Sequence, residues 1–138
     1  MKDSVTIQLR ENMSFNVKVN GHDMILDSSK EFGGNNEGPR PKSLMLVALA
    51  GCTGMDVVSI LRKMKVNFDD LKVEVSGNIT DEHPKHFDHM HIKYILRGKD
   101  IPFDKVNTAI NLSQEKYCGV SFSYRKSMNI THEVIIES

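Results

Sequence analysis

Alternating apolar and polar residues predict antiparallel strands in the first thirty positions. Residues 5–9 alternate in this way, and so do residues 15–19, which is the period of two that a half-buried strand shows. Asn20-Gly21 lies directly after the second run and predicts a hairpin turn, because both residue types tolerate positive φ. A third short strand is expected around Met24 to Asp27.

A long apolar stretch in the middle of the chain predicts a central helix. Residues 28–39 have the composition of a loop, and Pro41 suits the first turn of a helix, where its missing N–H costs nothing. From Leu44 to Ile60 nearly every position is apolar or small. A helix that is apolar on almost all sides must be covered on almost all sides. One small domain has too little further structure to supply that cover alone, so we expect a partner subunit to contribute.

The second half of the chain predicts two strands, a helix and a closing strand. Residues 71–79 and 90–96 alternate as hairpin mates, whereas residues 103–117 carry apolar side chains at spacings of three and four, the period of an amphipathic helix. Pro102 marks the start of this helix and Gly119 its expected stop. Residues 128–136 close the fold as a strand. The predicted order is β-β-β-α-β-β-α-β, an α+β fold with a mainly antiparallel sheet, in one domain of residues 1–138.

Composition narrows the functional classes. Of the 138 residues, 39% are hydrophobic, and eighteen basic residues balance eighteen acidic ones, so no net charge draws the chain to nucleic acid or to an anionic membrane. The N-terminus lacks the apolar segment of a secretory signal. The longest apolar run, Leu44 to Cys52, is about half the length of a membrane span. We therefore expect a soluble, cytoplasmic protein.

The chain has two cysteines, and Cys52 lies deep in the predicted central helix. Gly51 and Gly54 are poor helix residues and suggest that another segment packs closely there. A reactive thiol needs a lowered pKa, which burial opposes, and Cys52 is too far along the helix to use its N-terminal dipole. The candidate activating cations are Arg10, Arg40 and Lys42. Asp56, one turn further on, opposes a thiolate unless it holds that cation. The alternative is that both cysteines are inert core residues.

Cys118 is expected at the end of the second helix, in the run SQEKYCG. Carbonyl groups at a helix C-terminus disfavour an anion. By this reasoning Cys118 is the poorer thiolate and Cys52 the better candidate nucleophile. The separation of the two cysteines along the chain neither supports nor excludes contact between them.

Two segments resemble the OsmC/Ohr family, the osmotically inducible and organic-hydroperoxide-resistance proteins. Residues 38–64, GPRPKSLMLVALAGCTGMDVVSILRKM, resemble its central-helix signature, and residues 113–121, SQEKYCGVS, resemble its second cysteine motif. The resemblance implies an intertwined homodimer that reduces organic hydroperoxides in oxidative-stress defence, without metal or other cofactor. It also implies that Cys52 attacks the peroxide, that Cys118 resolves the product as a disulfide, and that a dithiol such as a lipoyl protein returns the electrons.

The chain departs from the family pattern at two places. Family members often carry a glutamate just inside the central helix, whereas this chain has Pro41-Lys42-Ser43-Leu44 there. The arginine that the hydroperoxide-resistance branch supplies from its early strands has only a loose match in Arg10. The chain is therefore closer to the broad OsmC-like group than to that branch. A non-enzymatic dimer that binds an apolar ligand or senses peroxide is the alternative function.

Histidines form the other notable group. His83, His86, His89 and His91 lie close together in sequence, and such a set is able to bind zinc or nickel. No spacing among them is typical of a metal site, so a solvated hairpin turn is the favoured interpretation. His132 interrupts an apolar strand face and is expected to be partly buried with a satisfied ring.

Overall fold

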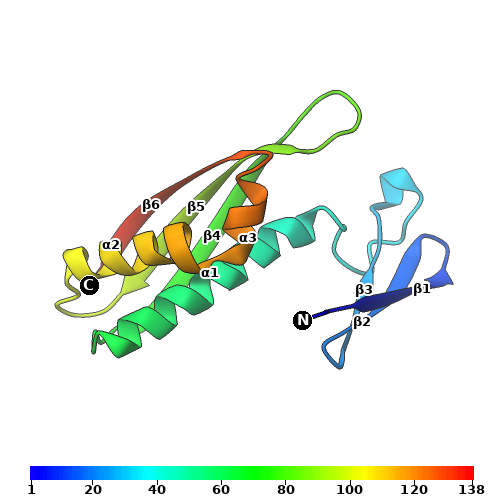
Figure 1. Ribbon diagram of the computed structural model, residues 1–138. Helices are drawn as coiled ribbons and strands as arrows, with labels where there is room; N and C mark the ends of the chain where they lie inside the picture. The colour runs from blue at the N-terminus through cyan, green and yellow to red at the C-terminus, as the bar shows by residue number, and fades with distance from the viewer. The chain divides into compact units, whose positions relative to one another are not determined.

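The computed structural model describes residues 1–138, which divide into two compact units, residues 1–45 and residues 46–138. Each unit contains its own three-stranded sheet, ordered β1-β2-β3 in the first and β4-β5-β6 in the second (Figure 1). The α+β class and the expected order of strands and helices are confirmed, with one further helix added before the last strand. The single domain over residues 1–138 stays a prediction.

The first unit is an antiparallel meander of β1 (Val5–Glu11), β2 (Ser14–Val19) and β3 (His22–Leu26). The predicted hairpin is confirmed, because Asn20 and Gly21 both have positive φ, 50° and 78°, as a two-residue turn of this kind requires. The backbone of these residues thus sets the register of β2 against β3.

One expectation for the first unit is wrong. The apolar residues of β1 were predicted to be half-buried, but Val5, Ile7 and Leu9 are 57%, 51% and 60% exposed. Period-two alternation identifies a strand with one apolar face, yet it does not say which molecule covers that face. Within residues 1–45, no other segment buries it.

The loop after β3 is held by Asp27, which is buried. Its carboxylate accepts hydrogen bonds from the backbone N–H groups of Ser28, Asn35 and Glu37, at 2.7–3.1 Å. A short 3-10 turn, Lys30–Phe32, lies within this loop. The loop predicted from composition is therefore an ordered segment.

The second unit packs helices on one face of a sheet made of β4 (Asp70–Ile79), β5 (Phe87–Arg97) and β6 (Asn129–Glu137) (Figure 1). β4 and β5 form the predicted antiparallel hairpin, whereas β6 pairs with β5 in parallel. Alternate residues of β5 are fully buried beneath the helices, namely Met90, Ile92, Tyr94 and Leu96. β5 is thus the central strand of the unit and its core.

The connection from β5 to β6 differs from the expected single helix. α2 (Phe103–Leu112) runs directly into a π-helical turn, Ser113–Tyr117, and after Cys118 a short helix, α3 (Gly119–Tyr124), begins. The preceding helical segment ends with Cys118 as its C-cap, directly before the predicted stop at Gly119, and Gly119 also begins α3. A glycine next to a helix end fits either position, and the sequence pattern did not distinguish the two.

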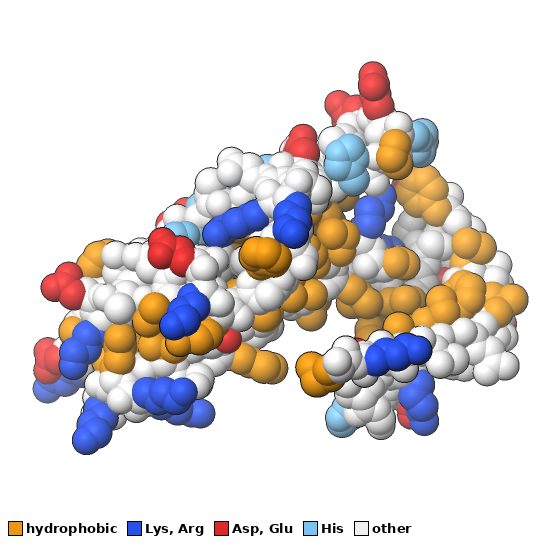
Figure 2. Space-filling view, viewed as in Figure 1, with side chains coloured by type: hydrophobic (Ala, Val, Ile, Leu, Met, Phe, Trp, Pro, Cys, Tyr) orange, Lys and Arg blue, Asp and Glu red, His pale blue; other side chains and the backbone are white.

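α1 (Ser43–Lys63) is the predicted central helix, and only one line of its residues is buried. Its buried residues, Leu49, Thr53, Val57 and Leu61, recur every fourth position, so they form one line along the helix. Val47 and Met55 are 62% and 77% exposed. Figure 2 shows that apolar side chains reach the surface at several places. The second unit therefore leaves part of this apolar helix exposed.

α1 is also the one helix that is long and apolar enough to cross a membrane by length and composition. This is weak support for a membrane span, because the core helix of a soluble protein meets the same criteria. Within the second unit, Thr53 of α1 is hydrogen-bonded to the strand residue Tyr94.

Candidate functional site

The second unit brings Cys52, Cys118 and Asp56 together. One ligand-type atom from each, the two sulfurs and a carboxylate oxygen, lies within 4.8 Å of the others. Cys52 and Asp56 come from successive turns of α1, and Cys118 joins the π-helical turn to α3. Cys52 and Asp56 are half-buried, whereas Cys118 is only 3% exposed. The contact between the two cysteines, which the sequence left open, is therefore part of the fold.

The expected environment of Cys118 is wrong. Its backbone caps the preceding turn, but its side chain caps the next helix: the Ser121 N–H donates to Cys118 Sγ at 3.4 Å. The adjacent Val120 N–H donates to the Cys52 sulfur. Donors at a helix start favour an anion, in contrast to carbonyl groups at a helix end. Helix position therefore gives Cys118 no disadvantage, and only exposure distinguishes the two thiols.

The pKa of the Cys52 thiol is raised above its ordinary value. Burial is the largest cause, and the nearby Cys118 and Asp56 raise the pKa further, while the Val120 N–H lowers it. A thiolate at Cys52 is thus disfavoured by desolvation and by a neighbouring carboxylate.

Asp56 is the end of a directed chain of hydroxyl groups. Ser113 Oγ donates its single proton to Asp56 Oδ2 at 2.9 Å, so Ser113 must accept from Thr53 Oγ1, which lies 2.8 Å away. Thr53 in turn accepts from the Tyr94 hydroxyl at 2.6 Å. Each hydroxyl has one proton to give, so all three point toward the carboxylate. Burial also raises the pKa of Tyr94 to about 12, which keeps this hydroxyl protonated.

Gln114 completes this network, and Arg125 fixes the orientation of its amide. The Arg125 guanidinium donates to Gln114 Oε1 at 2.8 Å, and a guanidinium is only a donor. The amide nitrogen therefore faces the other way, donating to Thr53 Oγ1 at 3.0 Å and to the Tyr94 hydroxyl at 3.1 Å. Ser121 Oγ donates to the same Gln114 oxygen at 3.0 Å. Every buried side-chain polar atom in the chain has a partner.

Sequence reasoning identified the two cysteines and Asp56 but missed this network. Two signals were available. Thr53 and Asp56 are polar residues within an otherwise apolar helical stretch, and Ser113 and Gln114 stand in the same motif as Cys118. A hydroxyl or amide at a core position needs a partner, so these residues could have been expected to meet.

The three candidate cations all belong to the unit of residues 1–45. Arg10 pairs with Glu37 at 3.3 Å, and Arg40 donates to the Gly38 carbonyl oxygen at 2.8 Å. Lys42 also has an interaction partner. Activation of Cys52 by one of these residues stays a prediction.

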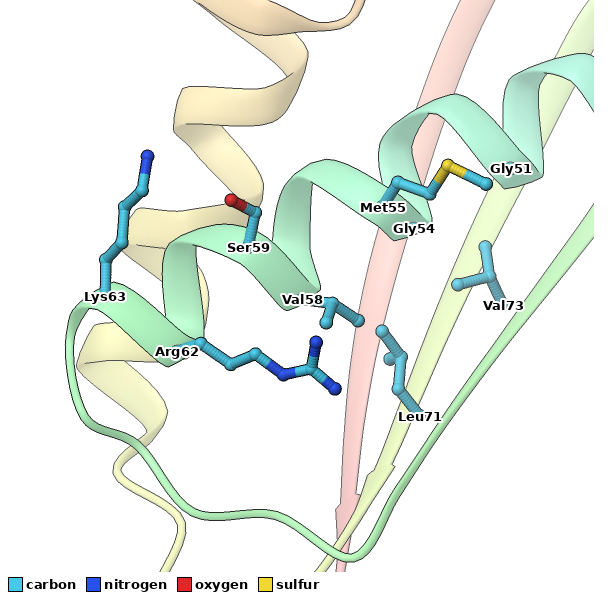
Figure 3. A pocket seen from close by; sticks show the side chains of 9 residues that line it. All are labelled: Gly51, Gly54, Met55, Val58, Ser59, Arg62, Lys63, Leu71 and Val73. Atoms are coloured by element: carbon cyan, nitrogen blue, oxygen red, sulfur yellow. The ribbon is translucent and has the colours of Figure 1, made fainter.

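An open apolar pocket of about 690 Å³ lies along α1, lined by Gly51, Gly54, Met55, Val58, Leu71 and Val73, with Ser59, Arg62 and Lys63 at one end (Figure 3). Nothing lies within 4 Å of where a Cβ on Gly51 would be, and Gly54 has only ordinary contact with Val73. The close packing expected at these glycines is therefore absent within one chain. Cys52 does not line this pocket.

A second pocket, of about 570 Å³, reaches Cys118. Its lining combines the aromatic rings of Tyr117 and Phe122 with three basic side chains, Lys116, Arg125 and Lys126. Lys126 lies over the ring of Phe122, with 4.6 Å between its Nζ and the ring centroid. The more buried thiol is thus the one beside this opening.

The histidines form no convergent ligand set. His89 and His91 both bond the Thr131 hydroxyl, at 2.9 and 2.7 Å, and His91 also pairs with Glu133 at 2.7 Å. His83 and His86 lie in and beside the exposed turn between β4 and β5. His132 is half-buried with its ring edge-on to Tyr94, 6.1 Å between centroids. The partial burial expected of His132 is confirmed.

Comparison with known proteins places this geometry in a family. Residues 34–133 match the family model described as OsmC-like protein. The chain is 34% identical over 114 residues to Protein YhfA of Escherichia coli K12, covering 83% of this chain and 82% of that protein. A crystal structure of a hypothetical protein from Aquifex aeolicus VF5 is 30% identical, with a TM-score of 0.85, and covers 100% of this chain and 99% of that one.

More distant structures share the fold. The organic hydroperoxide resistance protein OhrB of Bacillus subtilis is 16% identical with a TM-score of 0.65, and covers 97% of this chain and 98% of that one. The OsmC-like fold is consistent with a soluble protein. Since the family model covers most of the chain and the fold agrees with it, the protein belongs to the OsmC-like family.

Proposed function

We propose that the protein is a thiol peroxidase that reduces organic hydroperoxides through Cys52 and Cys118. The observation that carries this proposal is the placement of both sulfurs within 4.8 Å of each other, each with a backbone N–H donor. Family membership supports the same chemistry, because solved relatives of this fold are named organic hydroperoxide resistance proteins.

The proposed reaction has three balanced steps. The Cys52 thiolate attacks the distal peroxide oxygen, the O–O bond breaks, and the alkoxide takes up the thiol proton to leave as an alcohol. The Cys118 thiol then condenses with the Cys52 sulfenic acid, forming the disulfide and releasing water. An external dithiol reduces that disulfide by exchange and becomes a disulfide itself. A small dithiol or a lipoyl protein would meet this need.

Exposure supports the assignment of the two roles. Cys52 is half-buried, whereas Cys118 is 3% exposed, so an incoming peroxide reaches Cys52 more easily. Cys118 is held next to Cys52 by its place at the start of α3, where it is ready to condense with a sulfenic acid. These are the roles that the family resemblance implies.

The homodimer is part of the proposal. α1 exposes the apolar residues Val47 and Met55, and an open apolar pocket lies beside Gly51. We propose that a second copy of the chain covers both. An obligate interface of this kind commonly buries more than about 2,000 Å². A cation from residues 1–45 or from the partner would then offset the effect of Asp56 on the Cys52 thiolate.

Thiol titration of the native protein tests the peroxidase directly. One equivalent of cumene hydroperoxide should remove both thiols together, and a dithiol should restore both. A protein that only binds an apolar ligand would retain both thiols under the same treatment. Steady-state turnover with a panel of dithiols then identifies the electron donor, and retained thiols would refute the peroxidase.

A further inference from the structure

We infer that the reduced site binds one zinc ion through Cys52 Sγ, Cys118 Sγ and a carboxylate oxygen of Asp56. These atoms form the only set of three or more histidine, cysteine, aspartate or glutamate ligands that converges in the chain. The inference rests on the geometry of the reduced thiols and does not depend on the peroxidase activity. It also runs against the sequence-based expectation of no metal.

The distances suit a tetrahedral metal. Zinc takes sulfur ligands at about 2.3 Å and carboxylate oxygens at about 2.0–2.2 Å, which sets ligand atoms about 3.5–3.8 Å apart. The three atoms here already lie within 4.8 Å of one another, so side-chain movements of about 1 Å would close the site. A fourth position stays open for water or another small ligand.

Each of the three ligand side chains already accepts a hydrogen bond. The Ser121 N–H donates to the Cys118 sulfur at 3.4 Å, and Ser113 Oγ donates to Asp56 Oδ2 at 2.9 Å. The Val120 N–H donates to the Cys52 sulfur. Outer donors of this kind orient metal ligands and account for much of metal affinity. The three ligand side chains are therefore already oriented by hydrogen bonds before a metal binds.

Charge also favours a cation here. Two thiols, which bind zinc as thiolates, and a carboxylate converge here. The ligand set selects a borderline metal, since thiolates favour zinc and disfavour magnesium or calcium. With zinc bound, the site carries a net charge of −1, and Arg125, Lys116 and Lys126 line the pocket at Cys118.

Binding exchanges protons for the metal. Two thiols each lose a proton to solvent and bind zinc as thiolates, with no change in oxidation state. Zinc and the Cys52–Cys118 disulfide are therefore mutually exclusive, because both use the same two sulfurs. The metal form would hold the pair reduced and shielded from alkylation and from peroxide.

Cobalt(II) provides a spectroscopic test on the whole, reduced chain. Anaerobic titration of metal-stripped protein should give a sulfur-to-cobalt charge-transfer absorption that saturates at one equivalent, and added zinc should bleach it. Competition with a chromophoric chelator then gives the zinc affinity. The oxidised wild type, which keeps the fold and lacks free thiols, should give no such absorption.

Asp56→Ala tests the third ligand, with Asp104→Ala, an exposed acid in the first turn of α2, as the matched control. We expect Asp56→Ala to weaken zinc binding at least tenfold and Asp104→Ala to leave it within twofold. Three results would each overturn the inference: no sulfur-to-cobalt absorption with the reduced wild type, equal affinity in Asp56→Ala, or undiminished binding after oxidation. Peroxide consumption by the metal-free protein is measured separately, so the two proposals can fail independently.

Discussion

Ser113 donates a hydrogen bond from its Oγ to Asp56 Oδ2 at 2.9 Å, and this contact joins the α2 side of the fold to the turn of α1 that follows Cys52. Because Ser113 has only one proton, the contact also fixes the direction of the hydrogen bonds from Tyr94 and Thr53. The Asp56 carboxylate, which lies beside the two thiols, is thus held by a series of hydrogen bonds that starts at Tyr94 in the central strand β5.

Removing the middle hydroxyl of this chain should destabilise the fold. Thr53→Val keeps the shape of the side chain but leaves Tyr94, Ser113 and Gln114 short of a buried partner. An unsatisfied buried polar group costs about 1–3 kcal/mol, and we expect a loss in this range by urea unfolding. Thr108→Val, at an exposed hydroxyl of α2, should stay within about 0.5 kcal/mol. Equal losses of unfolding free energy in Thr53→Val and Thr108→Val would contradict a stabilising role for the hydrogen-bonded hydroxyl groups.

The two cysteines should respond differently to replacement. Cys52→Ser should abolish peroxide consumption, because the attacking sulfur is gone. Cys118→Ser should allow one turnover and trap a sulfenic acid at Cys52, detected by mass spectrometry as a dimedone adduct. An adduct on Cys118 in the Cys52→Ser protein, with peroxide consumption retained, would reverse the assignment.

Asp56→Asn should make the Cys52 thiol more acidic. The carboxylate raises the pKa of Cys52, so its neutralisation should move the pH midpoint of Cys52 alkylation downward and speed alkylation near pH 7. Asparagine can still accept from Ser113 through its amide oxygen. Alkylation by iodoacetamide in the Cys118→Ser background isolates the one thiol. An upward shift would mean that Asp56 holds an activating cation at the thiolate.

His132 should make stability depend on pH. Burial lowers the pKa of this histidine, and Arg125 and His91 lower it further, so the unfolded chain binds a proton more readily than the folded one. This contribution to stability is complete above the ordinary histidine pKa of about 6.5 and is lost as pH falls from that value through the lower pKa of the folded state. His132→Gln should flatten the dependence of unfolding free energy between about pH 8 and about pH 5, measured against His83→Gln in the exposed turn. An unchanged slope would refute this assignment.

A charge on the exposed face of α1 should separate the subunits. Met55 is 77% exposed in one chain, and Met55→Lys would place a charge where we propose that a second copy packs. We expect light scattering to show a dimer for the wild type and dissociation or unfolding for Met55→Lys. His83→Lys adds a charge at an exposed turn and should leave the dimer intact. A folded wild-type monomer at micromolar concentration would contradict the proposed homodimer.

Local patterns predicted the elements of this fold well, since strand alternation and helical spacing are properties of neighbouring residues. The hairpin at Asn20-Gly21 and the long helix around Cys52 follow from such patterns. The parallel pairing of β6 with β5 did not, because it is set by how the intervening helices pack on the sheet. The environment of Cys118 was missed because the sequence pattern did not show that a second helix begins directly after it. Cys118 therefore both ends one helical segment and caps the next.

The site was only partly predictable. Cys52, Cys118 and Asp56 could be named from sequence, but their convergence depends on contacts between residues far apart in the chain. The exposure of the β1 and α1 apolar faces marks the limit of single-chain reasoning, because apolar periodicity does not identify the covering molecule.

The parallel pairing of β6 has a consequence for how the protein matures. β5 and β6 are joined by the segment that carries Cys118, so that segment is anchored at both ends only after the final strand has docked. During synthesis, Cys52 emerges long before Cys118, and its thiol has no neighbour until the last stretch of chain is made. The nascent protein thus passes through an interval in which Cys52 is a lone thiol, open to adducts with cellular thiols.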